Sequence, residues 1–168
     1  AGAPLSNNYR PEIDVSPELE PTDAAYYQSL IGILRWMVEL GRIDICVEVS
    51  MMSSCLALPR EGHLMQVFYM FSHLEKNHNS EMVFDHSVPD IEHNDFPKQD
   101  WSNTVYANER GELKEEVPSN FPPSYGKGFV MRVYVDSDHA GDQVTRRSRT
   151  GFLVYLNNAL IYWSSKKQ

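Results

Sequence analysis

The stretch FVMRVYVDSDHAGDQVTRRSRTGFLVYLNNALIYWSS at 129–165 decides the fold of this chain. Every second residue along 129–135 is apolar, which predicts a β-strand because successive side chains of a strand point to opposite faces. A second strand is predicted at about 150–156 and a third at 159–164. Asn157-Asn158 fits the two-residue turn between them, since asparagine tolerates a positive φ angle. The strands together predict a three-stranded antiparallel meander.

The predicted meander has uncovered apolar surface and unpaired edges, because the sequence ends at Gln168, directly after the third strand. An unpaired edge strand is a template on which another chain can pair. We therefore expect a tendency of this sheet to associate or to lose order.

The strongest helical signal lies upstream of this sheet. Apolar side chains recur at three- and four-residue steps along 23–40, which predicts an amphipathic helix. Thr22 or Asp23 is expected to cap the start of this helix, and Gly41 is expected to end it.

The segment 43–57 has two interpretations. Residues 43–49 alternate strictly between apolar and polar or small side chains, which favours a strand. The apolar run then continues to Leu56 without a turn residue, and this length favours a helix. Periodicity alone leaves both interpretations open.

The next segments run from a helix into a long polar stretch. A helix is predicted from Pro59 to about Asn77, and 82–84 (Met-Val-Phe) is a short strand candidate. Residues 86–128 hold five of the ten prolines and a polar, acidic majority, so they are predicted to be a linker and a domain boundary. A small apolar anchor or an extra strand within this linker is expected from Trp101, Val105 and Tyr106.

The fold class predicted from these elements is α+β. Residues 1–21 contain four prolines and little apolar periodicity, which predicts an extended lead-in. The rest divides into a helical segment at 22–85, the acidic linker at 86–128 and the sheet at 129–168.

The charge is unevenly distributed along the chain. Its 168 residues carry a net charge of −8 and are 42% hydrophobic, which excludes collagen-like, coiled-coil and wholly disordered chains. Residues 1–126 hold 8 basic and 20 acidic side chains, whereas 127–168 hold 7 basic and 3 acidic ones. Attraction for phosphates is therefore expected only in the last quarter of the chain.

Two cysteines, Cys46 and Cys55, are too few for a disulfide framework. We expect both to be reduced core residues, and reduced cysteines indicate a cytoplasmic or nuclear protein. No apolar run reaches the roughly 18–20 residues that a bilayer requires, so no membrane partner is expected. Residues 1–4 lack both an initiator methionine and the pattern of a signal peptide, which indicates a piece of a longer polypeptide.

The candidate chemistry lies in the acidic segment at 136–142. Asp136 ends the first predicted strand and Asp138 follows two residues later, so both carboxylates point to one side if the strand continues. Oxygen ligands of this kind suit Mg²⁺, although such a turn is more often a solvated loop. His139 is a possible metal ligand but fits better as a polar turn residue. The basic cluster at 146–149 either contacts phosphates or is a solvated hairpin loop.

The sequence resembles the copia-type retrotransposon polyprotein at the junction where the reverse transcriptase ends and ribonuclease H begins. The resemblance covers about 22–85 and 117–168. It is carried by blocks in this order: YQSLIGILRWMVELGRIDI at 27–45, P-x3-H-x4-F at 59–68, FSHL at 71–74, YVDSDHAGD at 134–142 and TRRSRTGFLVYLNNALIYWSSKKQ at 145–168.

This resemblance implies a thumb- or connection-like helical segment, in which 43–57 is helical, followed by the first three strands of ribonuclease H at 129–168. The family's ribonuclease H uses two Mg²⁺ ions, held by carboxylates, to hydrolyse RNA in RNA–DNA hybrids. Asp136 matches the first metal-binding aspartate and is the candidate catalytic residue, with Asp138 as a further candidate ligand. The candidate hybrid contacts are Arg146, Arg147, Arg149 and Thr150.

The resemblance also has a gap that bears on activity. In the family, a helix with the catalytic glutamate follows the KKQ motif, whereas here nothing follows Gln168. This chain alone is therefore expected to be inactive, with an RNA–DNA hybrid and the rest of the polyprotein as its partners. The alternative is a degenerate or domesticated remnant that binds nucleic acid or another protein without catalysis. A small hydrolase that uses Asp136 and His139 is a third hypothesis, but it would lack a nucleophile. The segment 134–137 also resembles the Tyr-x-Asp-Asp box of a polymerase, but Ser137 replaces the second aspartate of that box.

Overall fold

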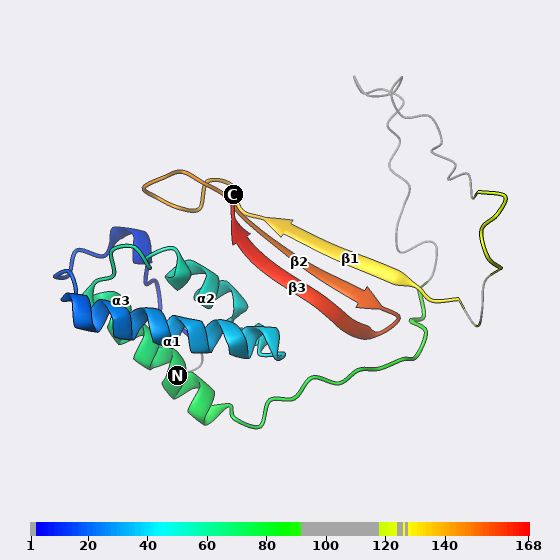
Figure 1. Cartoon of the computed structure of the whole chain (residues 1–168), viewed down its shortest axis with the longest axis horizontal. Helices are drawn as coiled ribbons and strands as arrows, with labels where there is room; N and C mark the ends of the chain where they lie inside the picture. Colours follow the sequence, from blue (N-terminus) through cyan, green and yellow to red (C-terminus); the bar gives the residue numbers. More distant parts are fainter. Residues whose placement is uncertain (1–2, 92–117, 124–125, 127) are drawn as a thin grey trace, which may run out of the picture.

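The computed structural model describes residues 3–91, 118–123, 126 and 128–168. Three helices and a three-stranded antiparallel sheet make up its regular structure, which confirms the predicted α+β class (Figure 1). The helices are α1 (Pro21–Glu39), α2 (Cys46–Ser53) and α3 (Glu61–Lys76), and the strands are β1 (Met131–Ser137), β2 (Arg149–Leu156) and β3 (Ala159–Lys167).

Helix α1 lies where its apolar pattern predicts, but its start differs from the expected one. The helix begins at Pro21, and neither Thr22 nor Asp23 caps it; Glu20 is the N-cap residue and makes no side-chain cap bond. Proline suits the first helical position because the N–H that it lacks would have no partner there. Gly41 follows the helix with a φ of 113°, as its predicted role as terminator requires.

The segment with two interpretations is helical. A 3-10 turn at Ile43–Ile45 leads directly into α2, so the strand interpretation is wrong and the helix implied by the resemblance is confirmed for 46–53. Ile45, Val49 and Met52 follow one another at four- and three-residue steps and are fully or almost fully buried. This burial at helical spacing decides the conformation.

Helix α3 begins at Glu61 rather than at Pro59. The carbonyl of Pro59 instead accepts a hydrogen bond from Leu19 N at 3.0 Å, within a short antiparallel bridge between the lead-in and the start of the helix. Buried His63 then fixes the lead-in: its Nδ1 accepts from the main-chain N–H of Arg60, and its Nε2 lies 3.0 Å from the carbonyl oxygen of Pro11.

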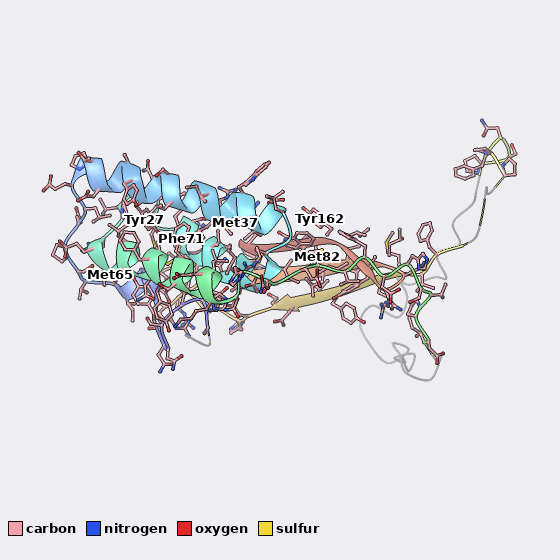
Figure 2. The ribbon with its side chains drawn as sticks, turned by 90° about the horizontal axis from the view of Figure 1, so that it is seen from below. Tyr27, Met37, Met65, Phe71, Met82 and Tyr162 are labelled. Carbon is pink, nitrogen blue, oxygen red and sulfur yellow. The ribbon has the colours of Figure 1, made fainter. Side chains whose placement is uncertain are left out.

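The lead-in is more than the extended segment that its prolines predict. It contains a 3-10 turn at Pro11–Ile13, and Leu5 belongs to the buried core. Tyr9 and Leu19 pack against the same core, which Tyr27 and Phe71 enter from two different helices (Figure 2). The lead-in therefore folds onto the helical unit because its apolar side chains find partners there.

Two further expectations concern the segment after α3. The predicted strand at 82–84 is wrong, because these residues have no regular structure and the side chains of Val83 and Phe84 are largely exposed. The expected anchor at Trp101, Val105 and Tyr106 lies outside the described residues.

The sheet confirms the predicted meander and extends its third strand to Lys167. Asn157 takes a φ of 53° in the turn between β2 and β3, as the asparagine pair predicts. Its side-chain oxygen accepts the main-chain N–H of Val130 at 2.9 Å, which ties the turn to the start of β1. A register shift between Val154 and Tyr155 leaves Ile161 of β3 as an extra residue, as in a β-bulge.

The sheet is partly covered, by residues that precede it in the chain. Strand β3 packs against α2, and Trp163 lies against the helical core while its Nε1–H donates to the carbonyl oxygen of Val38 at 3.1 Å. The expectation that the sheet's apolar surface lacks a cover is therefore wrong on the β3 side. Strand β1, at the other edge, keeps Met131, Val133 and Val135 exposed.

Candidate functional site

The candidate site is the β1–β2 connection, where the acidic and basic residues singled out by sequence meet the helical unit. Asp136 lies near the end of β1, opposite Gly151 of β2. Its side chain is exposed and takes part in none of the side-chain hydrogen bonds or ion pairs of the described residues. With respect to the described residues, the Asp136 carboxylate is therefore open to an incoming ligand.

Asp138 has a different role, because its carboxylate closes the loop. Its Oδ1 accepts the main-chain N–H of Arg149 at 2.5 Å, and its own N–H donates to the carbonyl oxygen of Arg149 at 3.1 Å. The same carboxylate lies against Gly141, where a Cβ atom would stand 1.9 Å from Oδ2. Asp138 and Asp136 thus differ in environment although they are two residues apart.

Asp142 organises the tip of the connection. Its Oδ1 accepts the main-chain N–H groups of Val144 and Thr145, at 3.1 and 2.7 Å, and its Oδ2 pairs with the ammonium group of Lys167 on β3. Burial alone would raise the pKa of this carboxyl, but the hydrogen bonds from Lys167 and Thr145 lower it far below its usual value. Asp142 is therefore an ionised structural group.

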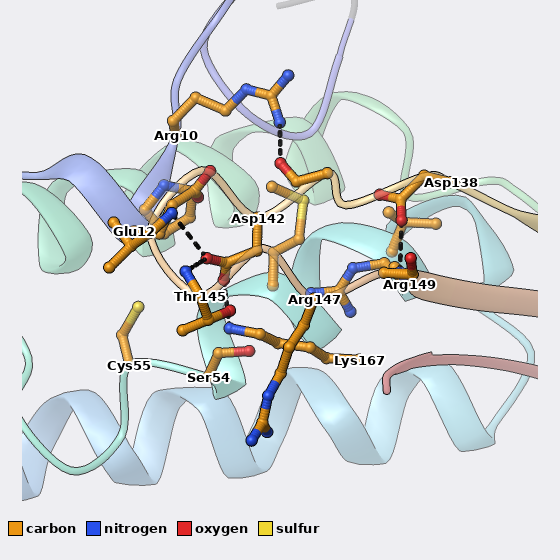
Figure 3. Close-up of a pocket in the computed structure, with 16 residues that line it drawn as sticks. Arg10, Glu12, Ser54, Cys55, Asp138, Asp142, Thr145, Arg147, Arg149 and Lys167 are labelled. Atoms are coloured by element: carbon orange, nitrogen blue, oxygen red, sulfur yellow. Dashed lines mark hydrogen bonds and ion pairs between the residues drawn. The ribbon is translucent and has the colours of Figure 1, made fainter.

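A cavity of about 340 Å³ lies under the connection, between the lead-in, α2 and the end of β3 (Figure 3). The lead-in reaches across it: Arg10 donates to the carbonyl oxygen of Gly141, and Glu12 accepts the main-chain N–H of Gln143, both at 3.4 Å. The charged side chains that line it are Arg10, Glu12, Asp138, Asp142, Arg147, Arg149 and Lys167. Side chains of both charges line this cavity, so it is a mixed polar site.

The four predicted nucleic-acid contacts fall into two pairs. Arg146 and Arg147 are exposed at the tip of the connection, and their guanidinium groups take part in none of the hydrogen bonds of the described residues. Arg149 instead donates to the hydroxyl of Ser50 on α2, and burial lowers its pKa. Thr150 accepts a hydrogen bond from the side chain of Gln168.

The described residues do not by themselves fit a two-metal centre. Carboxylate oxygens are the correct ligands for Mg²⁺, but two ions held about 3.5–4 Å apart require several of them. Groups of three or more His, Cys, Asp or Glu side chains placed to hold a metal ion are absent from the part of the chain that the structure describes. Asp136 stands there as a single open carboxylate.

Sequence reasoning missed Ser50, Arg10 and Lys167 as parts of this site. Ser50 is 99 residues from Arg149 and Arg10 is 131 residues from Gly141, whereas Lys167 is 25 residues from Asp142 but on a different strand. No local pattern signals such contacts, because a serine on a helix and a lysine at the end of a strand are ordinary surface residues.

Comparison with known proteins gives one distant relative. Over 158 residues the chain is 25% identical to the Retrovirus-related Pol polyprotein from transposon RE1 of Arabidopsis thaliana. The chain is similar to part of a retrotransposon polyprotein. The alignment covers 94% of this chain and 8% of the relative, so the chain spans a small fraction of that protein.

The other comparisons assign no family to the chain. No family model matches the sequence, and no solved structure matches it significantly. Within the described ranges, none of the helices is both long and apolar enough to cross a bilayer. The similarity to the transposon protein therefore supports a retrotransposon polyprotein without assigning an activity to this segment.

Proposed function

We propose that this chain is a segment of a copia-type retrotransposon polyprotein, from the region where the reverse transcriptase ends and ribonuclease H begins. The similarity over 158 residues, which includes both the helices and the sheet, supports a retrotransposon polyprotein. The copia type and the junction are proposed from the sequence blocks at 27–45, 59–74 and 134–168. In this assignment 22–85 is the thumb- or connection-like segment and 129–168 contributes the first three strands of ribonuclease H.

The activities proposed for the whole polyprotein are RNA-directed DNA synthesis and Mg²⁺-dependent hydrolysis of RNA in RNA–DNA hybrids. Asp136 is the residue of this chain that would contribute to the metal centre, since its carboxylate is exposed and unpaired among the described residues. Asp138 is less available because it is bonded to the main chain of Arg149. With one open carboxylate, the 168-residue chain is expected to be inactive alone.

The proposed partner is an RNA–DNA hybrid, contacted through the exposed guanidinium groups of Arg146 and Arg147. Two arginines at a loop tip can each reach a phosphate, and such contacts position a protein on a duplex without reading its sequence. Both protrude from the part of the chain with excess positive charge. Binding should weaken as salt rises, because counterions are released from the phosphates.

A non-catalytic role is the second candidate. Asp138, Asp142 and Arg149 all make contacts within the chain that hold the connection in place, which favours a structural or binding module. In this interpretation the arginines still bind nucleic acid, and Asp136 has no metal to hold.

Fluorescence anisotropy with a labelled RNA–DNA hybrid tests the binding proposal at low and moderate salt. The double variant Arg146→Ala, Arg147→Ala should lose at least tenfold in affinity. Arg35→Ala, Lys76→Ala is the matched control, because it removes the same charge from exposed positions on α1 and α3. Absence of binding at low salt, or equal losses in both variants, would contradict the proposal.

A cleavage assay tests the inactivity of the isolated chain. The same hybrid is incubated with Mg²⁺ or Mn²⁺ and the 168-residue protein, and we expect no product above background. Product that disappears in Asp136→Asn would show that the chain is an active nuclease by itself.

A further inference from the structure

His63 holds the lead-in against the start of α3 through both nitrogens of its ring, and the residue is only 3% exposed. Its Nδ1 accepts the main-chain N–H of Arg60 at 3.0 Å, and its Nε2 lies 3.0 Å from the carbonyl oxygen of Pro11. Because a carbonyl oxygen can only accept, the ring proton is on Nε2 and Nδ1 carries the lone pair. The geometry therefore requires the neutral ring.

A protonated His63 ring cannot keep both of these hydrogen bonds. Protonation places a hydrogen on Nδ1, which then faces the Arg60 N–H at the 3.0 Å separation of the two nitrogens. Two donors oppose each other in a buried site, and the Arg60 N–H loses its acceptor. The other buried histidine of the described residues differs, because His73 Nε2 lies 3.3 Å from a carboxylate oxygen of Asp44. A charged ring keeps that partner, so the contacts of His63, unlike those of His73, depend on the neutral form.

The ring of His63 has neighbours on α1 and at the start of α3. The centroid of the Tyr27 ring lies 6.3 Å from that of His63, and burial raises the pKa of the Tyr27 phenol, so this group stays neutral. The Arg60 guanidinium donates to the carbonyl oxygen of Ser16 at 2.6 Å and lies 3.3 Å from the Glu18 carboxylate. Neither Tyr27 nor Arg60 is a counter-charge for a protonated imidazole.

The lead-in brings one carboxylate, that of Asp14, near the ring. Burial raises the pKa of Asp14, but hydrogen bonds from Ser16 and Tyr9 and the nearby His63 lower it overall. Its Oδ2 accepts the hydroxyl of Tyr9 at 2.6 Å, and its Oδ1 accepts the main-chain N–H of Ser16 at 2.9 Å. Asp14 attracts a charged ring, but its oxygens are bonded to other groups and do not replace the contact with Arg60.

The lead-in residues beside this contact also reach the β1–β2 connection. Arg10 and Glu12 flank Pro11 in the chain. Their side chains bond to the main chain of Gly141 and Gln143 across the cavity (Figure 3). A lead-in that leaves α3 therefore also loses its hold on the connection and opens one wall of the cavity.

We propose that His63 is a pH-sensitive contact: uptake of a proton at Nδ1 releases the lead-in from α3 and, with it, the β1–β2 connection. Acid favours whichever state binds the proton, and an accessible histidine takes up its proton near about pH 6.5. The lead-in is therefore held above this pH and released below it. This inference does not depend on the proposed function, because it uses only contacts among the described residues.

Amide hydrogen exchange of the 168-residue chain, at about pH 7.5 and about pH 5.5, tests the release. The N–H groups of Leu19 and Glu61 are the reporters, because they donate to carbonyl oxygens across the contact, each at 3.0 Å. After correction for the intrinsic effect of pH on exchange, their protection should fall by about tenfold or more at the lower pH. The protection of Leu34, in the core of α1, should not change. Unchanged protection of Leu19 and Glu61, or an equal loss at Leu34, would overturn the proposal.

The variant His63→Gln separates this residue from the other histidines. Glutamine at the third position of a helix accepts the N–H of the N-cap residue in a capping box, and it does not titrate. Its reporters should stay equally protected at the two pH values. His78→Gln is the matched control, because it removes an exposed histidine and should keep the wild-type response. A response that persists in His63→Gln, or that disappears in His78→Gln, would overturn the assignment.

Nitrogen NMR of the His63 ring gives a readout in the wild-type chain. At about pH 7.5 the ring should carry its proton on Nε2. It should gain the second proton over the pH range in which Glu61 loses protection and the amide signals of Gly141 and Gln143 shift. A ring that becomes charged while the lead-in stays protected would overturn the proposal. Stationary signals of Gly141 and Gln143 would overturn the release of the connection.

Discussion

The hydroxyl of Ser50 on α2 donates a hydrogen bond to the main-chain carbonyl oxygen of Ser165 on β3, at 2.7 Å. The same hydroxyl accepts from the guanidinium group of Arg149, so one serine side chain joins α2 to two strands of the sheet. On the same helix, burial raises the pKa of the Cys46 thiol. Ser50 thus gives the Ser165 carbonyl, on the outer strand of the sheet, a hydrogen-bond donor.

Replacing Ser50 with alanine should therefore loosen the sheet from the helices. The substitution leaves the Ser165 carbonyl and the half-buried Arg149 without their partner, and we expect a loss of about 1–3 kcal/mol in the free energy of unfolding. Urea denaturation measures this change. Ser54→Ala is the matched control: that exposed hydroxyl bonds only within its own helix, so a loss as large as that of Ser50→Ala would contradict the interpretation.

The helical core should respond to truncation according to burial. Leu34 is fully buried on α1, and Leu34→Ala should cost about 2–5 kcal/mol because it removes apolar contacts and leaves a cavity. Ile33 is adjacent in sequence but 49% exposed, so Ile33→Ala should cost much less. Thermal or urea unfolding of the two variants compares them, and similar losses would mean that the helix face is wrongly placed.

Asp142 should make stability depend on pH in the acid range. Its pKa is lowered in the folded state from the ordinary 3.8, because the hydrogen bonds of Lys167 and Thr145 outweigh the effect of burial. A carboxyl with a depressed folded pKa contributes stability above its unfolded pKa and loses it as pH falls toward the folded value. The stability difference between wild type and Asp142→Asn should thus be complete at pH 7 and shrink below about pH 4. A difference that stays constant from pH 7 to pH 2 would argue against the ion pair.

Variants of Asp136 and Asp138 should show which aspartate of the candidate site stabilises the fold and which is free for chemistry. Asp136→Asn should change the free energy of unfolding by less than about 0.5 kcal/mol, since the side chain is exposed and unpaired among the described residues. Asp138→Ala should cost about 1–3 kcal/mol because the Arg149 N–H loses its acceptor. Denaturation curves of both variants check this order, and the reverse order would show that Asp136 has structural contacts of its own.

The elements that sequence predicted best are those whose evidence is local. The period of α1 and the Asn157-Asn158 turn depend on neighbouring residues, so their side-chain pattern and φ preference were sufficient. The helix at 46–53 was not decidable in this way, because its alternating start fits both periods. Its conformation follows from the burial of Ile45, Val49 and Met52 against the other helices.

By itself, the sequence determined the α+β class, the order of the three strands and the acidic and basic residues grouped between β1 and β2. Only the tertiary structure decided which of those charged groups remain open. The side chains of Asp136, Arg146 and Arg147 are exposed and unpaired among the described residues, whereas Asp138 and Arg149 are engaged by partners that folding brings to them. The physical reason is that a hydrogen bond depends on distance in space, and contacts such as that between Ser50 and Arg149 join residues 99 positions apart.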